Sequence, residues 1–197
     1  MIRTMEPEAW IMPKKTVFVN LFGGPGLGKS TTAAGVFHML KMHGVDAELV
    51  TEFPKDLTWE NRDYTLGNQV YVFGKQHHRH WRLDGRVDVV VTDSPILLSM
   101  VYSDDERLHK MALHEFARMG TTHINYLLRR FKKYNPNGRN QTLAQAREKD
   151  AQIQACLETN SVPFSTVRGD HDAVNKIVRA VLGRSSRKLR YQITRRT

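Results

Sequence analysis

Residues 23–30, Gly-Gly-Pro-Gly-Leu-Gly-Lys-Ser, constrain the fold of this chain of 197 residues more than any other segment. An apolar run, residues 17–22, precedes them, and a stretch with helical character, residues 31–43, follows. The segment matches the pattern G-x-x-x-x-G-K-[ST] in its strand–loop–helix setting. Its glycines leave backbone N–H groups free to surround a polyphosphate, and the start of the helix adds partial positive charge. The sequence therefore predicts a loop for a nucleoside triphosphate, formed by Gly23, Gly24, Pro25, Gly26, Leu27, Gly28, Lys29, Ser30 and Thr31.

Three side chains near this loop are candidates for phosphate chemistry. Lys29 can reach the β- and γ-phosphates, and the hydroxyl of Ser30 can hold Mg²⁺. Asp93 follows the apolar run 89–92, so we expect its carboxylate beside the loop, where it could hold Mg²⁺ directly or through water. Asp93 could also cap the turn before Pro95, and the two roles are compatible.

Apolar β-branched runs alternate with helical patterns along the chain, which predicts an α/β fold around a parallel sheet. Residues 87–91 are almost all apolar, as expected for a strand covered on both faces. Gly44 and Gly120 follow helical segments where a left-handed residue is common, and Thr142 with Gln145 forms a capping-box pattern. The expected strands are 16–22, 47–51, 87–92, 123–128 and 164–167, and the expected helices are 31–43, 66–84, 105–119, 143–160 and 172–182.

The net charge of +10 is concentrated in two short segments. Residues 129–139 and 184–197 contain Lys and Arg but no acidic residue, and the rest of the chain is close to neutral. Each segment could contact a polyanion, and a solvated tail is the alternative for 184–197. We expect a lead-in at 1–15, one domain at 16–183 and a basic tail at 184–197.

No apolar run in the sequence is long enough for a secretory signal or a membrane span. Cys156 is the single cysteine, so no intrachain disulfide can form. We therefore expect a cytoplasmic protein without a membrane partner, and the sequence leaves its oligomeric state open.

Ligands of parallel sheets bind at the carboxyl ends of the strands, so residues after the second expected strand are candidates for a second substrate. Glu52 could orient and deprotonate an acceptor hydroxyl there, and Asp56 or Asp63 could do so instead. Gln69 could hydrogen-bond a base edge because its amide both donates and accepts. A base could stack on one of the aromatic residues nearby, which are Phe53, Tyr71 and Trp59. The alternative for these aromatic residues is packing in the core.

The expected helix 66–84 carries two neighbouring stripes of side chains. The apolar stripe consists of Leu66, Val70, Phe73, His77 and Trp81. The polar stripe consists of Gln69, Gln76 and His80.

The first basic segment has the composition of a mobile lid, expected at about 129–141. Turn-forming residues at 135–138 interrupt its charges. Arginines in such a lid can neutralise a transferring phosphoryl group and exclude water, and a solvated loop is the alternative. The candidates are Arg129, Arg130 and Arg139.

These motifs together resemble those of the P-loop nucleoside and nucleotide kinases. Glu52 and Gln69 are similar to the acceptor carboxylate and the base-reading glutamine of deoxynucleoside kinases, while Asp93-Ser94-Pro95 replaces the Glu-Arg-Ser usual there. The resemblance implies a three-layer sandwich around a five-stranded parallel sheet in the order 2-3-1-4-5. It also implies ATP and Mg²⁺ as cofactors, and a substrate site that includes Phe53 and Arg130.

Five segments are similar to those of the bacteriophage 5-hydroxymethyluracil DNA kinases: the phosphate loop, 51–53, 71–78, 92–95 and 134–142. This resemblance implies phosphorylation of a hydroxymethyl group on a pyrimidine in DNA, in the host cytoplasm, with DNA bound through the lid and the tail. One alternative is a kinase for a free nucleoside or nucleotide, nicotinamide riboside included. The other is an ATPase or switch module without a phosphoryl acceptor.

Overall fold

The computed structural model describes residues 15–120, 122–131, 135 and 142–193, with residues 184–193 described by backbone alone. Five parallel strands form one sheet in the order β2-β3-β1-β4-β5, which confirms the expected order. Val17 pairs with both Val89 and Thr122, so the carboxyl ends of the central strands meet at one edge. The strands are β1 (Val17–Phe22), β2 (Ala47–Val50), β3 (Val89–Thr92), β4 (Thr122–Arg129) and β5 (Ser165–Arg168).

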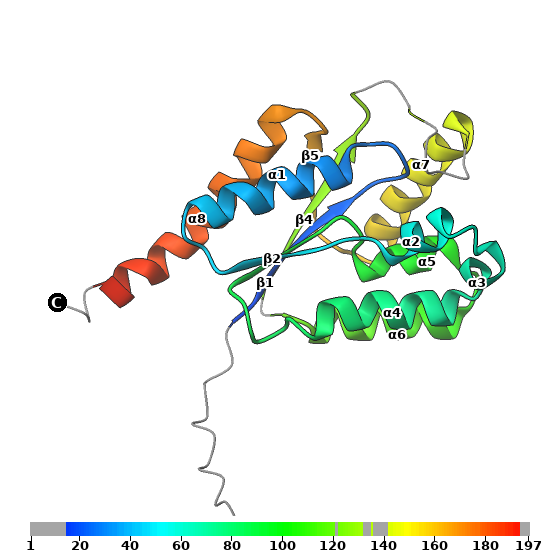
Figure 1. The fold of residues 1–197 in the computed structure, drawn as a ribbon, viewed down its shortest axis with the longest axis horizontal. Coiled ribbons are helices and arrows are strands. Elements are labelled where there is room, and N and C mark those ends of the chain that lie inside the picture. Colours follow the sequence, from blue (N-terminus) through cyan, green and yellow to red (C-terminus); the bar gives the residue numbers. More distant parts are fainter. Residues whose placement is uncertain (1–14, 121, 132–134, 136–141, 194–197) are drawn as a thin grey trace, which may run out of the picture.

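Helices cover both faces of the sheet and complete three layers (Figure 1). One face packs on α1 (Lys29–Met42) and α8 (His171–Ile193), and the other on α4 (Gln69–Trp81), α6 (Glu106–Arg118) and α7 (Leu143–Thr159). Shorter elements complete the described chain: α2 (Phe53–Trp59), α3 (Asp63–Gly67), η1 (Ile96–Leu98) and α5 (Ser99–Tyr102).

Alternation along β1 explains how one strand serves two cores. Val19 and Leu21 join the core beneath α1 and α8, whereas Phe18 and Phe22 join the core beneath α4, α6 and α7. Successive side chains of a strand point to opposite faces, so a strand covered on both sides must be apolar throughout. The expected three-layer α/β architecture is confirmed.

Local signals mark several helix ends as expected. Thr142 accepts a hydrogen bond from the backbone of Gln145, and the Gln145 side chain accepts one from the backbone of Thr142, so the capping box opens α7. Gly44 and Gly120 have φ values of 72° and 71°, in the left-handed region that follows a helix.

The helix expected at 66–84 is observed as α4, which is shorter at both ends, and residues 66 and 67 belong to α3 instead. Asn68 ends α3 and caps α4, its side chain accepting a hydrogen bond from the Tyr71 backbone at 3.1 Å. Such a side-chain bond satisfies a free N–H at a helix start and favours a boundary there. The helix α2 that follows β2 was also not expected from the sequence.

The two stripes of α4 do not divide simply between core and solvent. Val70 and Trp81 of the apolar stripe are 62% and 53% exposed, whereas Gln76 and His80 of the polar stripe are buried. Hydrogen bonds to neighbouring strands offset the cost of burying these two polar side chains.

The last helix, α8, continues past the boundary expected at residue 183 and projects away from the sheet (Figure 1). Its described buried residues all precede that boundary: Ala173, Ile177, Val178 and Val181. No helix in the described part of the chain combines the length and apolar character needed to cross a bilayer.

Candidate active site

The phosphate loop joins β1 to α1 through three glycines with positive φ. Gly23, Gly26 and Gly28 have φ values of 141°, 78° and 88°, a backbone region that side chains rarely adopt. Gly28 directly precedes α1, and its carbonyl accepts the first helical hydrogen bond from Thr32 at 2.8 Å. The loop therefore leads straight into the first turn of a helix, the geometry that binds anions.

A carboxylate on α7 anchors the middle of this loop. The backbone N–H of Gly24 donates to Asp150 Oδ1 at 2.8 Å, and Lys29 Nζ donates to the Gly24 carbonyl at 3.0 Å. A Cβ at Gly24 would lie 2.5 Å from the same carboxylate oxygen and 2.7 Å from the Ala146 carbonyl. Only glycine allows this approach, and the motif alone did not indicate the part that Asp150 plays.

A cavity of about 310 Å³ lies between the loop and the segment that follows β2. Gly26, Lys29 and Ser30 line it on the loop side, together with Pro25, Gly28 and Thr31. Glu52 and Gln69 line it on the other side, and the residues that follow β3, from Ser94 to Tyr102, contribute several more. Gly23, Gly24 and Leu27 shape the loop without lining this cavity, and Leu27 packs in the core.

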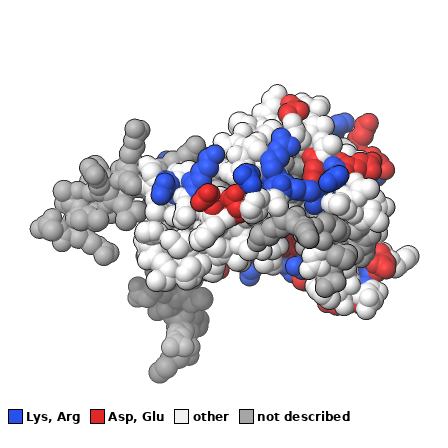
Figure 2. Space-filling view, turned by 90° about the horizontal axis from the view of Figure 1, so that it is seen from above, with Lys and Arg blue, Asp and Glu red and all other residues white. Residues whose placement is uncertain are grey.

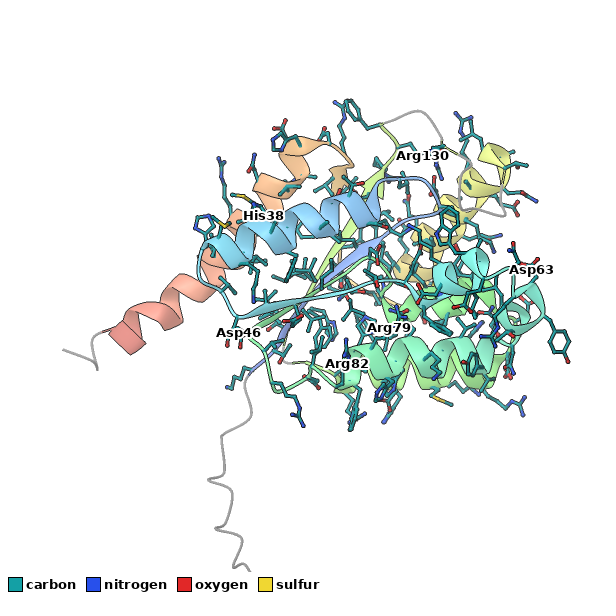
Figure 3. The ribbon with its side chains drawn as sticks, viewed as in Figure 1. His38, Asp46, Asp63, Arg79, Arg82 and Arg130 are labelled. Carbon is teal, nitrogen blue, oxygen red and sulfur yellow. The ribbon has the colours of Figure 1, made fainter. Side chains whose placement is uncertain are left out.

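Glu52 is the one carboxylate of the described residues that lines this cavity. It precedes α2 and makes no side-chain capping bond there. The two alternatives do not line the cavity: Asp56 forms an ion pair with Arg79 at 2.5 Å, and Asp63 lies on α3 (Figure 3). The geometry therefore favours Glu52 over both for contact with an acceptor.

Asp93 lies where β3 ends, and only 1% of its surface is exposed. Its Oδ1 atom has no hydrogen-bond partner among the described residues. A buried carboxylate oxygen without a partner costs free energy, so this atom is suited to bind a cation. The chemistry fits Mg²⁺, which takes one or two protein oxygens and completes its shell with water and phosphate oxygens. Ser30, at the start of α1, offers a second oxygen ligand.

Phe53, predicted to contact a substrate, packs elsewhere. Its ring contacts Tyr71 edge-to-face at 5.7 Å, and the Arg79 guanidinium lies 5.3 Å from its centre. Phe53 does not line the cavity, because α2 begins at this residue and α4 packs beside it. Trp59 is 63% exposed and also lies outside the cavity lining.

Gln69 and Tyr102 offer polar groups to a ligand in the cavity. The Gln69 side chain donates to the Leu66 carbonyl at 2.8 Å. Tyr102 keeps 38% of its surface exposed, yet desolvation raises its pKa to about 12, with the carboxylates of Glu52 and Asp150 adding to the shift. The phenol therefore keeps its proton at neutral pH and remains a hydrogen-bond donor. Sequence analysis missed Tyr102 because nothing local marks the short helix α5.

The described arginines of the expected lid occupy two different environments. Arg129 is exposed at the end of β4, in register with Arg168 of β5. Arg130 does not line the cavity and instead bonds to α7, with Nε 2.6 Å from Asp150 Oδ2 and Nη2 donating to the Ala146 carbonyl at 2.9 Å (Figure 3). Arg139 and most of the expected lid lie outside the described residues.

Known proteins support this assignment of fold. The family model described as "AAA domain" matches residues 18–173, whereas no curated protein matches the chain. A solved structure of deoxyadenosine kinase from M. mycoides, with dCMP and dCDP bound, is similar at a TM-score of 0.53. The two sequences are 14% identical, and the similarity covers 86% of this chain and 98% of the kinase, so it shows the P-loop nucleotide-kinase fold. Because the family model spans most of the sequence, the chain belongs to the AAA domain family.

Proposed function

We propose that this protein is an ATP- and Mg²⁺-dependent kinase that transfers a phosphoryl group to a hydroxyl. The observation that carries the proposal is the shared cavity, which has the phosphate loop on one side and Glu52 on the other. A transfer site needs a phosphate donor and a base for the acceptor within reach of the same space. An ATPase also uses a residue that orients the attacking water, so the feature that favours a kinase is the space for a larger acceptor, which extends from the loop past Glu52 to Gln69 and Tyr102.

Lys29, Ser30 and Glu52 would act through their positions in the lining of this cavity. Lys29 and the loop N–H groups stabilise the charge of the β- and γ-phosphates, and Ser30 with Asp93 would hold Mg²⁺, which neutralises phosphate charge. Glu52 accepts the proton of the acceptor hydroxyl while the oxygen of that hydroxyl forms a bond to the γ-phosphorus. The bond from that phosphorus to the β–γ bridging oxygen breaks, and ADP leaves. Arg129 and Arg139 would neutralise the transferring group.

We further propose that the acceptor is the hydroxymethyl group of 5-hydroxymethyluracil in DNA. Three of the segments that resemble phage DNA kinases lie together, because Gln76 bonds to the backbone of both Thr51 and Ser94. A base must leave the duplex to enter such a cavity, and Gln69, which lines the cavity, would hydrogen-bond the edge of that base.

Exposed cations near the loop support a polyanionic substrate. Arg129 and Arg168 end neighbouring strands in register, and Gly169, next to Arg168, lies against the phosphate loop. Figure 2 shows a band of Lys and Arg side chains across the face seen from above, with Asp and Glu beside it. We propose that DNA contacts this side, together with the lid and the basic tail, so binding should weaken steeply with salt.

The test offers γ-labelled ATP and Mg²⁺ to duplex DNA with and without 5-hydroxymethyluracil, and separately to free nucleosides and nucleotides. Label in the modified duplex alone, absent with Lys29→Ala, is the expected result. Label in free nucleosides or nucleotides alone would refute the DNA substrate. Hydrolysis that no acceptor changes would refute the kinase and favour an ATPase.

A small-molecule kinase is the second candidate, favoured by a cavity at the small end of the range for ligand sites. Truncation after Gly183 separates the two, because the described buried residues of α8 precede that position. Unchanged activity on a free nucleoside after truncation supports the small-molecule kinase. Loss of activity on modified DNA, with native folding retained, supports the DNA kinase.

A further inference from the structure

Gln76 joins the two loops that carry the candidate carboxylates. It lies on α4 with 5% of its surface exposed, and its amide makes three hydrogen bonds to backbone groups. Phe53 N–H donates to Oε1 at 2.8 Å, and Nε2 donates to the Thr51 and Ser94 carbonyls at 3.3 Å and 3.2 Å. One side chain therefore connects the carboxyl ends of β2 and β3.

These three contacts surround the residues to which we assign chemistry. Thr51 and Phe53 are the neighbours of Glu52, and Ser94 is the neighbour of Asp93. Because the Glu52 side chain makes no capping bond, its place over the cavity depends on how its backbone is held. The Gln76 amide holds that backbone on both sides and ties it to the segment of Asp93.

Only an amide can make this set of bonds at this length. Its oxygen accepts while its nitrogen donates two protons, and both protons are already used by carbonyls. A carboxylate would place an oxygen against the Thr51 and Ser94 carbonyls, and an apolar side chain would leave all three groups unpaired. For the same reason Gln76 is not free to read a base, unlike Gln69.

The rest of α4 keeps Gln76 in place. The carbonyl of Gln76 is 2.8 Å from His80 Nδ1, and His80 Nε2 is 3.1 Å from Thr92 Oγ1 in β3. Arg79 also donates to the Thr51 carbonyl, at 3.1 Å, and so adds a second bond from α4 to the loop after β2. The Gln76 amide bonds directly to both loops.

We propose that Gln76 is a positioning residue that holds Glu52 at a fixed distance from the Asp93 metal site, a proposal that rests on the function inferred above. Glu52 and the Asp93 metal site would act on the same transition state, so the distance between them affects kcat. The affinity for ATP depends instead on the phosphate loop, and the three hydrogen bonds of the Gln76 amide go to other segments. Loss of the amide should therefore lower kcat and leave the KM for ATP nearly unchanged.

The test compares Gln76→Met, which keeps the size of the side chain, and Gln76→Glu, which keeps its shape, with the exposed control Gln152→Met. We expect kcat to fall by about 10- to 100-fold in both Gln76 variants, with the KM for ATP changed by less than about threefold. The control should match the wild type. An unchanged kcat, or a loss of ATP affinity as large as the loss of kcat, would overturn the proposal.

Hydrogen exchange of the same proteins tests the connection without any acceptor. Gln76→Met should lose protection both at residues 51–53 and at 94–95, while the protection of β1 remains. If the wild type binds ATP but phosphorylates nothing, the proposed kinase function fails, and this measurement still decides whether Gln76 joins the loops. Unchanged protection at either segment would refute the connection.

Discussion

Asp93→Asn should stabilise the unliganded protein while removing its response to Mg²⁺. Asp93 is 99% buried, and its Oδ1 has no partner among the described residues. An unsatisfied buried polar group costs about 1–3 kcal/mol, and a charge adds to this cost. Asn has the same shape but no charge, so we expect the free energy of unfolding to rise by about 1 kcal/mol. For a chain of this length that raises Tm by about 2–4 °C.

Urea unfolding with and without Mg²⁺-ATP measures both effects. Ligand at 100 times its Kd stabilises the wild type by about 2.7 kcal/mol, and the part that depends on Mg²⁺ should disappear in Asp93→Asn. Asp104→Asn is the control, because Asp104 is exposed in the loop that precedes α6, and it should change stability by less than about 0.5 kcal/mol. If Asp93→Asn lowers stability, or keeps the full Mg²⁺ response, the assignment of Asp93 as a metal ligand is wrong.

Three further predictions concern the loop, the lid and a buried histidine. Lys29→Ala should abolish phosphoryl transfer with little change in circular dichroism. Transfer at the wild-type rate would contradict the assignment of Lys29 to the active site. Arg129→Ala or Arg139→Ala should lower kcat more than ATP affinity, whereas a defect in binding alone would make the lid a clamp. Burial lowers the pKa of His80 from 6.5 to about 4, so the folded protein binds its proton less readily than the unfolded chain. Neutral His80 therefore contributes about 3 kcal/mol to the free energy of unfolding. This contribution is complete above pH 6.5 and is lost as the pH falls toward 4. The free energy of unfolding should change less with pH across this range in His80→Gln than in the wild type. An equal pH dependence in the two proteins would refute the lowered pKa of His80.

The loop and the strand ends could be predicted because their signals are local. A spacing of glycines before Lys29 specifies the backbone, and an apolar run before Asp93 specifies a buried strand. Parallel strands then bring their carboxyl ends to one edge, which is why Glu52 could be assigned to the same site. The capping box at Thr142 marked the start of α7 for the same local reason.

Periodicity failed on α4 because burial there follows hydrogen bonding and not polarity. Gln76 and His80 belong to a polar stripe, yet each is buried and bonded to a segment at least 12 positions away. Trp81 belongs to the apolar stripe, yet 53% of its surface is exposed. No pattern within the helix contains these partners.

The sequence by itself determined the α/β fold, the phosphate loop and the edge of the sheet where chemistry can take place. These follow from patterns in short windows, where residue type limits the backbone directly. Only the tertiary structure decided that Asp150 anchors Gly24 across 126 positions, that Phe53 packs against Tyr71 and does not line the cavity, and that Gln76 joins the loops of Glu52 and Asp93. Such contacts depend on how whole helices pack on the sheet, and that packing is set by the complete core.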